Sequence, residues 1–100
     1  MSKIKYVSGD FDCDDNNLKS LKGSPEKVDG NFWCSDNKLT SLEGCPEKVG
    51  GSFACGGNKL TSLEGSPKYV GGDFDCFRNP TKFTEENVRK VCDVKGKIYV

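Results

Sequence analysis

Histidine is absent from this chain of 100 residues, and tryptophan and methionine each occur once. Without imidazole, the chain lacks the commonest general base, and it can form no triad or zinc site that depends on histidine. Neither sign of charge is in excess, because 15 Lys and Arg residues balance 15 Asp and Glu residues. We therefore expect neither a general nucleic-acid binder nor a membrane-surface binder that works through bulk charge.

Long apolar runs are also missing. No stretch approaches the roughly 18 residues of a membrane span, and the opening MSKIKYVSGD lacks the apolar core of a signal peptide. We expect a cytoplasmic protein with no membrane partner. The length allows one small domain over residues 1–100. Only 34% of the residues are hydrophobic and 12 are glycine, which directs attention to internal repeats.

Four glycines spaced 21 residues apart mark such a repeat. The copies span 9–29, 30–50 and 51–71, with a partial copy at 72–80, and the second and third share 14 of 21 positions. The consensus is G-x-F-x-C-x-x-N-x-L-x-S-L-x-G-x-P-x-x-V-x. The segment Lys5-Tyr6-Val7 matches Lys68-Tyr69-Val70, so we expect a truncated copy to open the chain.

Each fixed position of the repeat has a physical use. Alternation of Phe and Cys with variable residues predicts a short strand with one buried face. The following Asn suits a ladder of side-chain amides that bond the backbone where the chain turns. The Gly-x-Pro step excludes a long helix on the return side. One copy cannot bury its own apolar face, so we expect the copies to stack as a parallel sheet about 4.8 Å apart.

The pattern fails after Asn79, and residues 81–100 read as a cap of one helix and one strand. Thr84 is the expected N-cap, while Asn87 at N3 is expected to leave the capping box incomplete. Gly96 is expected to end the element, with a last strand over 97–100. The amino end has no comparable lid, so its open strand edge is a candidate for pairing with another chain.

The core F-x-C-x-x-N-x-L-x-S-L is similar to the leucine-rich-repeat core L-x-L-x-x-N-x-L-x-x-L, with Phe and Cys at two Leu positions. The short repeat with Pro on the return side resembles the bacterial-effector subclass, although it is one residue longer. With its ending FTEENVRKVCDVKGKIYV, the chain resembles small leucine-rich-repeat proteins encoded by large tailed bacteriophages. The resemblance implies a solenoid with a parallel β concave face and an irregular convex face. It also implies a non-catalytic protein that binds another macromolecule, such as a host protein.

The positions that alternate with Phe and Cys are expected to point outward, and their variation among copies marks them as positions that the fold does not dictate. Trp33 stands beside a third strand with small residues, and it is the candidate anchor of an interface, because aromatic residues dominate interface hot spots. An alternative is that Trp33 only covers neighbouring backbone. The candidate partner-binding residues are Asp10, Asp12, Asp14, Asn31, Trp33, Ser35, Ala54, Asp73, Asp75, Phe77 and Arg78.

The aspartates on the first and fourth strands admit several interpretations. They would favour a partner with a basic or mixed surface, or they serve only to keep the open sheet soluble. Clustered carboxylates also suit hard cations, but alternate strand residues form a row rather than a cage. No nucleophile or partner base accompanies them, so we predict neither an enzyme nor a cofactor.

Six cysteines invite a disulfide interpretation, but four of them follow the 21-residue period on the expected buried face. We expect Cys13, Cys34, Cys55 and Cys76 to form a reduced core ladder. Cys45 replaces a serine of the other copies and is expected on the turn side, as a candidate for the most reactive thiol.

The leading functional hypothesis is a non-catalytic protein–protein interaction module, such as a phage factor that inhibits or redirects a host protein in the host cytoplasm. One alternative is a structural protein that self-associates through its amino-terminal edge. A second, weaker alternative is a metal-dependent protein that uses the aspartate rows. No nucleic-acid partner is predicted.

Overall fold

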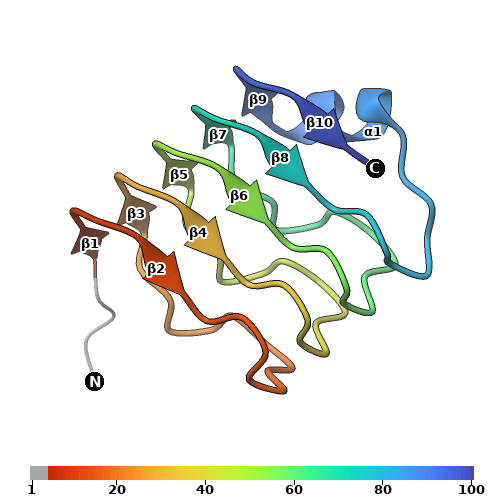
Figure 1. Ribbon diagram of the computed structural model, residues 1–100, viewed down its shortest axis with the longest axis horizontal. Coiled ribbons are helices and arrows are strands. Elements are labelled where there is room, and N and C mark those ends of the chain that lie inside the picture. The colour runs from red at the N-terminus through yellow and green to blue at the C-terminus, as the bar shows by residue number, and fades with distance from the viewer. Residues whose placement is uncertain (1–4) are drawn as a thin grey trace.

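The structure is a computed structural model that describes residues 5–100, and in it the chain winds as a coil with two short strands in each turn (Figure 1). The elements are β1 (Tyr6–Val7), β2 (Phe11–Asp12), β3 (Lys27–Val28), β4 (Phe32–Trp33), β5 (Lys48–Val49), β6 (Phe53–Ala54), β7 (Tyr69–Val70), β8 (Phe74–Asp75), α1 (Glu85–Val91), β9 (Asp93–Val94) and β10 (Ile98–Tyr99). We call each consecutive strand pair a rung, from rung 1 (β1 and β2) to rung 5 (β9 and β10).

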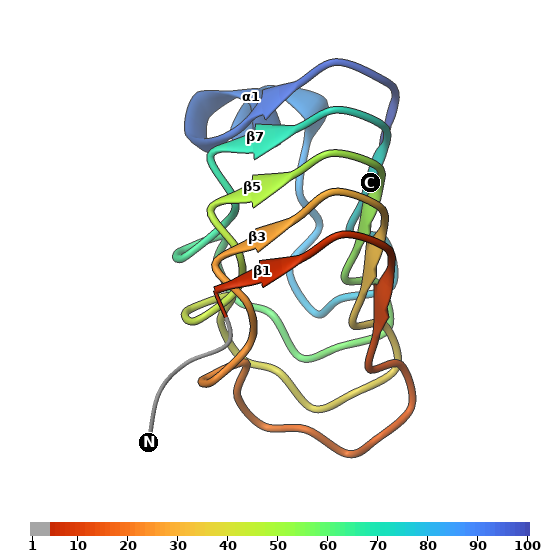
Figure 2. The same ribbon diagram turned by 90° about the vertical axis from the view of Figure 1, so that its left-hand side faces the viewer.

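The strands form two parallel five-stranded sheets that share the same stacking direction. The first sheet has the order β1-β3-β5-β7-β9, and the second has the order β10-β8-β6-β4-β2. Figure 2 shows the first sheet face on, with the chain bending at its edge into the second sheet. Parallel stacking of the repeats is therefore confirmed. The sequence analysis expected one sheet, however, and the repeated valines build another.

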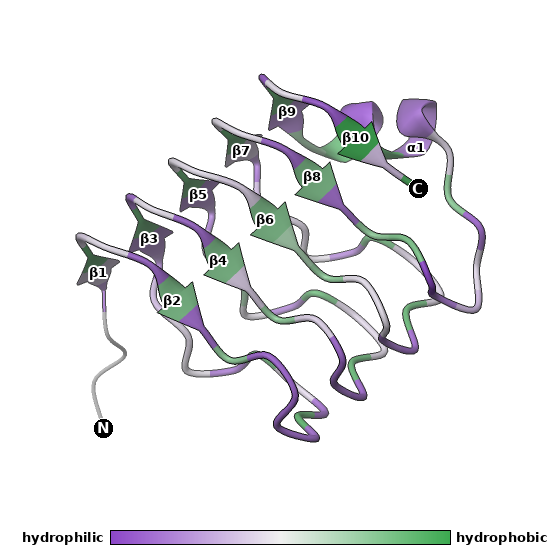
Figure 3. Ribbon diagram, viewed as in Figure 1, coloured by the Kyte–Doolittle hydropathy of each residue, from purple (hydrophilic) through white to green (hydrophobic). Residues whose placement is uncertain are grey.

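Stacking follows the 21-residue repeat, so identical residues lie above one another. Phe11, Phe32, Phe53 and Phe74 are successive partners in the second sheet. Their ring centroids are 5.2, 5.6 and 5.2 Å apart. Figure 3 shows hydrophobic residues recurring at the same place in successive strands of this sheet. The Phe column, together with the Cys, Leu and Val columns, makes one continuous core between the sheets and the return loops.

The predicted asparagine ladder is present. Asn58 lies buried between rungs, and its side chain makes five hydrogen bonds to backbone groups. Its Oδ1 accepts from the backbone N–H of Asn37 and Leu39. Its Nδ2 donates to the carbonyls of Cys34, Cys55 and Gly56. Each such amide ties two rungs together where the chain leaves the strand, and so satisfies backbone groups that no sheet can pair.

The carboxyl-terminal segment differs from the expected cap in two respects. Asn87 completes the capping box, because its Oδ1 accepts from the N–H of Thr84 while the Thr84 hydroxyl oxygen accepts from the N–H of Asn87. The expectation of an incomplete box was wrong, since an Asn amide oxygen reaches the same N–H as Glu or Gln. Residues 93–94 also form a strand, so the cap contains rung 5, with Val94 paired to Val70 and Ile98 paired to Phe74.

The cysteine column is buried as predicted in three rungs, and Cys13 in rung 1 is only partly exposed. Burial raises the pKa of the Cys34 and Cys55 thiols well above the usual range. Cys45 lies on the return side, but it is 8% exposed and donates to the Gly65 carbonyl. Its predicted place on the turn side is confirmed, but the next turn of the coil covers it, which argues against Cys45 as the most reactive thiol.

Cys13 is expected to alkylate on the order of a hundred times more slowly in the folded chain than an ordinary thiol at pH 8. Burial, with added repulsion from the Asp14 and Asp12 carboxylates, raises its pKa from 9.0 to about 11. Iodoacetamide labelling followed by mass spectrometry, with and without urea, measures the ratio. Equal rates in both conditions would contradict this environment.

Candidate functional site

The outer face of the second sheet carries a row of five side chains, one from each rung. Their backbones are partners in register, while the neighbouring Phe and Ile side chains point into the core. Because side chains alternate along a strand, the row faces outward. In stacking order it consists of Asp12, Trp33, Ala54, Asp75 and Tyr99. We call it the Trp33 row.

Trp33 is half-buried on β4, the second strand from the amino-terminal edge of this surface. Its neighbour on the carboxyl-terminal side is Ala54, which leaves space beside the indole, and Asp12 lies on the other side. Tyr99 ends the row at 46% exposure and was not predicted from the sequence. One sequence feature could have identified Tyr99 as a member of the row: Gly96-Lys97-Ile98-Tyr99 is similar to the repeated G-x-F-x pattern.

A second outward set lies where the chain leaves the strands, and it includes Phe77 and Arg78. Phe77 is 41% exposed, and the Arg78 guanidinium lies 5.0 Å from the centre of its ring. Arg78 also approaches Asp36 Oδ1 at 3.5 Å. Arg78 adopts a φ of +62°, the left-handed conformation that the equivalent Asp15, Asp36 and Gly57 also adopt. The predicted Phe77 and Arg78 therefore form one exposed cluster beside the Trp33 row.

The predicted residues at the corner between the sheets have a structural role instead. The side-chain oxygens of Asp10, Asn31 and Ser52 accept hydrogen bonds from the backbone N–H one rung further on. Asp73 Oδ1 does the same for the N–H of Lys97, at 2.8 Å. The prediction that the fold does not dictate these positions was wrong, because every copy carries a side-chain acceptor there.

Asp12 and Asp75 belong to the Trp33 row and Asp14 follows it along the chain, but each uses an oxygen internally. Asp12 Oδ1 accepts from the N–H of Asp14, and Asp75 Oδ1 accepts from the N–H of Phe77. Asp14 Oδ1 accepts from the N–H of Ser35 at 2.6 Å. Among residues 5–100, no group of three or more acidic or cysteine side chains converges as a metal site would require. The aspartates therefore act as turn-forming acceptors that also set a negative potential.

Electrostatics distinguishes Asp14 and Asp75 from the other carboxyls of this face. Burial raises the pKa of Asp14, with further increases from the Asp12, Asp36 and Asp15 charges, against the lowering effect of its bond from Ser35. Burial likewise raises the pKa of Asp75, while its bond from Phe77 and the Arg78 charge oppose the increase. Both charges are therefore less stable in the folded chain than in water.

Asp14→Asn is expected to raise the melting temperature at pH 7. The amide oxygen can still accept from Ser35, while the unfavourable charge is removed. A carboxyl with a raised folded-state pKa holds its proton more tightly in the folded state, so its destabilising effect appears as pH rises through that pKa. The gain in melting temperature should therefore shrink as pH falls toward 3.8, the ordinary pKa of an aspartate carboxyl. Thermal melts at pH 7 and pH 3.5 measure the gain, with Glu64→Gln at an exposed carboxyl of a return loop as the control. A gain that is unchanged at low pH would contradict the assignment.

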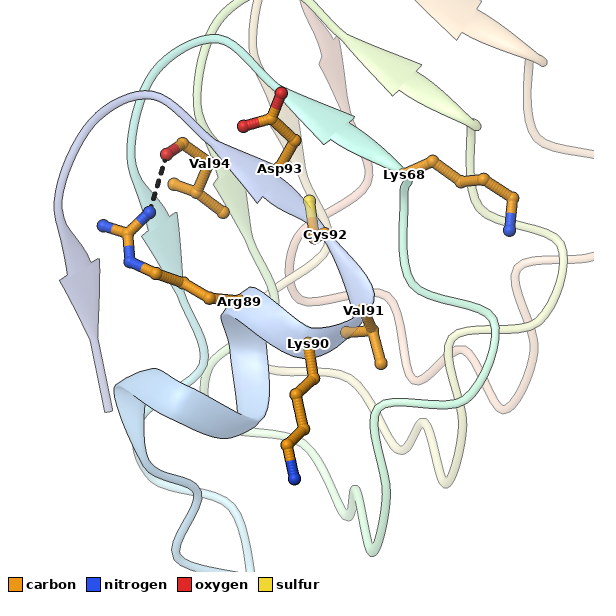
Figure 4. Close-up of a pocket in the computed structure, with 7 residues that line it drawn as sticks. All are labelled: Lys68, Arg89, Lys90, Val91, Cys92, Asp93 and Val94. Carbon is orange, nitrogen blue, oxygen red and sulfur yellow. Dashed lines mark hydrogen bonds between the residues drawn. The ribbon is translucent and has the colours of Figure 1, made fainter.

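The hollow beside α1 does not form an anion site. It measures about 480 Å³ and is lined by Lys68, Arg89 and Lys90 among others. Figure 4 shows these three side chains extending in different directions. The Arg89 guanidinium donates to the Val94 carbonyl at 2.8 Å, so it links the helix to rung 5. The hollow therefore supplies no convergent set of charges.

The two sheets and the stacked columns define this protein as a parallel β-solenoid of five rungs with one short helix. No protein-family model, curated protein or solved structure matches the chain. In residues 5–100, no helix has the length and hydrophobicity that crossing a membrane would demand.

Proposed function

We propose that this chain is a non-catalytic protein-binding solenoid of the leucine-rich-repeat type, and that the Trp33 row is its binding face. One observation supports the proposal above the others. The only tryptophan of the sequence projects from an outward sheet face, one strand in from its edge, and it lies half-buried beside the small Ala54. Large aromatic side chains next to space for a partner are typical of interface hot spots.

The charges around Trp33 favour a particular class of partner. Asp12 and Asp75 belong to the same row, and Asp14 lies two residues after Asp12 along the chain. Phe77, Arg78 and Tyr99 add aromatic and cationic groups at the far end. A partner with a basic or mixed surface and one apolar pocket or ridge complements this arrangement. The resemblance to phage-encoded proteins supports a host protein in the cytoplasm as that partner, inhibited or redirected by occupation of its surface.

Trp33→Ala is expected to weaken partner binding about tenfold or more, as loss of a hot-spot aromatic does. The matched control is Tyr6→Ala, which removes an aromatic side chain, 52% exposed, from the other sheet. Immobilised wild type and both variants are incubated with bacterial lysate, and the bound proteins are quantified by mass spectrometry. Affinities for the purified candidate then follow by titration.

A protein retained by wild type and Tyr6→Ala but lost by Trp33→Ala supports the proposal. The double variant Asp12→Lys with Asp75→Lys should lose the same protein, because it reverses the charges that flank the indole. Equal capture by all variants would refute the assignment of this face.

A further inference from the structure

The amino-terminal end of the solenoid is built like an interior rung but has no described rung before it. β1 and β2 are the last strands in their sheets. Phe11, Cys13 and Leu18 remain partly exposed, whereas their equivalents in rungs 2 and 3 are fully buried. With Leu21 they line a hollow of about 170 Å³. This end therefore offers apolar surface that the repeat covers everywhere else.

The same end also presents backbone and amide groups that the repeat would bond to a preceding rung. The N–H groups of Gly30, Gly51 and Gly72 each donate to the glycine carbonyl one rung earlier, at 2.8 to 3.0 Å. Asn37 and Asn58 likewise donate through Nδ2 to a cysteine carbonyl of the preceding rung, at 3.0 Å. In the described part of the chain, no preceding rung offers carbonyls to the N–H of Gly9 and the Nδ2 of Asn16.

The edge of β2 is open in the geometry of a parallel ladder. The N–H groups of Phe11 and Cys13 donate to the Asn31 and Trp33 carbonyls of rung 2, both at 2.8 Å. Because alternate residues of a parallel strand bond to opposite neighbours, the N–H and C=O of Asp12 point to the uncovered side. Such an edge accepts an added strand.

The charge of this edge selects the strand that fits. Asp10, Asp12, Asp14 and Asp15 lie within six residues. A second copy paired edge to edge would bring these carboxylates together, and like charges on paired strands are destabilising. Self-association through β2 is therefore disfavoured, and a basic strand is favoured.

The same acidic sequence pairs elsewhere in the chain with a strand that follows two lysines, although at its opposite edge. The sequence Gly-Asp-Phe-Asp-Cys occurs at 9–13 and again at 72–76. The second occurrence pairs, through its other edge, with β10, where Ile98 opposes Phe74 and Tyr99 opposes Asp75. β10 follows Lys95 and Lys97, so this pentapeptide already accommodates a strand with basic and apolar residues.

We propose that the open edge of rung 1 binds an extended, lysine-rich segment of a partner protein, which adds a parallel strand to β2. An apolar residue of the segment covers Phe11 and the hollow, and its basic residues lie beside Asp10 and Asp12. The backbone carbonyls of the segment accept hydrogen bonds from the N–H groups of rung 1 that point away from rung 2, such as that of Asp12. This site shares Asp12 with the Trp33 row, but its strand edge and its hollow belong to rung 1 and do not include Trp33.

The test uses a peptide with the sequence of residues 94–100, Val-Lys-Gly-Lys-Ile-Tyr-Val, with blocked ends. It is titrated into the full ¹⁵N-labelled chain, and amide resonances are followed by NMR. Saturable shifts are expected at Gly9, Asp10 and Asp12. The double variant Asp12→Asn with Asp15→Asn should bind roughly fivefold more weakly, and binding should weaken in high salt. Asp93→Asn, at an exposed carboxyl of rung 5 outside both sites, is the control and should bind as wild type does.

Two further peptides complete the design. Replacing both lysines by glutamate should abolish the shifts, and so should replacing the tyrosine by proline, which removes a strand donor. The absence of saturable shifts at millimolar peptide would overturn the proposal, as would shifts centred on β8 and β10. Rung 1 shifts that appear on concentrating the protein alone would also overturn it, because they would assign the edge to self-association.

Discussion

Asn58→Ala is expected to destabilise the protein by about 4 kcal/mol or more, because five backbone partners lose a hydrogen bond inside the core. Asn58 is 6% exposed, so water cannot replace the lost amide without opening the stack. A small domain has only about 5–15 kcal/mol of stability in total. The variant should therefore be largely unfolded or melt at far lower urea. Urea titration followed by Trp33 fluorescence measures the change.

Asn16→Ala is the matched control for this prediction. Asn16 occupies the same place in rung 1, but it is exposed, and within residues 5–100 its Nδ2 donates only to the Asp14 carbonyl. Its replacement should cost less than about 1 kcal/mol. If the two variants lost similar amounts of unfolding free energy, the asparagines would act locally in their own turns rather than by joining rungs.

Gly51→Ala should cost about 3 kcal/mol through steric overlap alone, at the upper end of the range for overpacking. A Cβ at this position would lie 2.8 Å from the Gly30 carbonyl oxygen and 2.5 Å from Asn31 Oδ1. The carbonyl belongs to the backbone ladder, so it cannot move aside without disturbing rung 2. Thermal and urea unfolding of the purified variant would show the loss.

Gly9→Ala tests the same repeat position without a preceding rung. A Cβ there meets nothing within 4 Å in the described structure. The substitution should change stability by less than about 0.5 kcal/mol, or raise it slightly by restricting the unfolded chain. If Gly9→Ala were as damaging as Gly51→Ala, the glycine would serve its own turn and not the contact between rungs.

The stacking direction, the inward Phe and Cys columns and the Asn ladder could be predicted because each recurs at a fixed spacing. The first sheet could not. Each repeat contributes only one buried residue, an isolated valine, to the first sheet, so no alternation can be recognised there, whereas Phe and Cys alternate in the second. Strand β10 lies within the predicted strand over 97–100, but β9 escaped prediction because α1 lengthens its turn, placing Val94 at 24 residues from Val70 instead of 21.

At the candidate site, variation among copies marked outward positions with no shared atom type in one row. In another row it wrongly marked positions that the fold does dictate. Asp12, Trp33, Ala54 and Asp75 differ in chemistry and share only their outward position. Asp10, Asn31, Ser52 and Asp73 differ in name but share a side-chain oxygen, which the corner requires. Internal variation therefore marks a position as unconstrained only when no single atom type is common to all copies.

The central claim is that repeats 21 residues apart lie in register, with Phe and Cys inward and the Trp33 row outward. NOE measurements on a sample with selectively labelled phenylalanine test it most directly. The structure predicts cross-peaks between the rings of Phe11 and Phe32, Phe32 and Phe53, and Phe53 and Phe74, whose centroids lie 5.2 to 5.6 Å apart. The Trp33 indole should instead show contacts with Ala54. Missing ring-to-ring cross-peaks in a folded sample, or an indole in contact with the phenylalanine column, would contradict the claim.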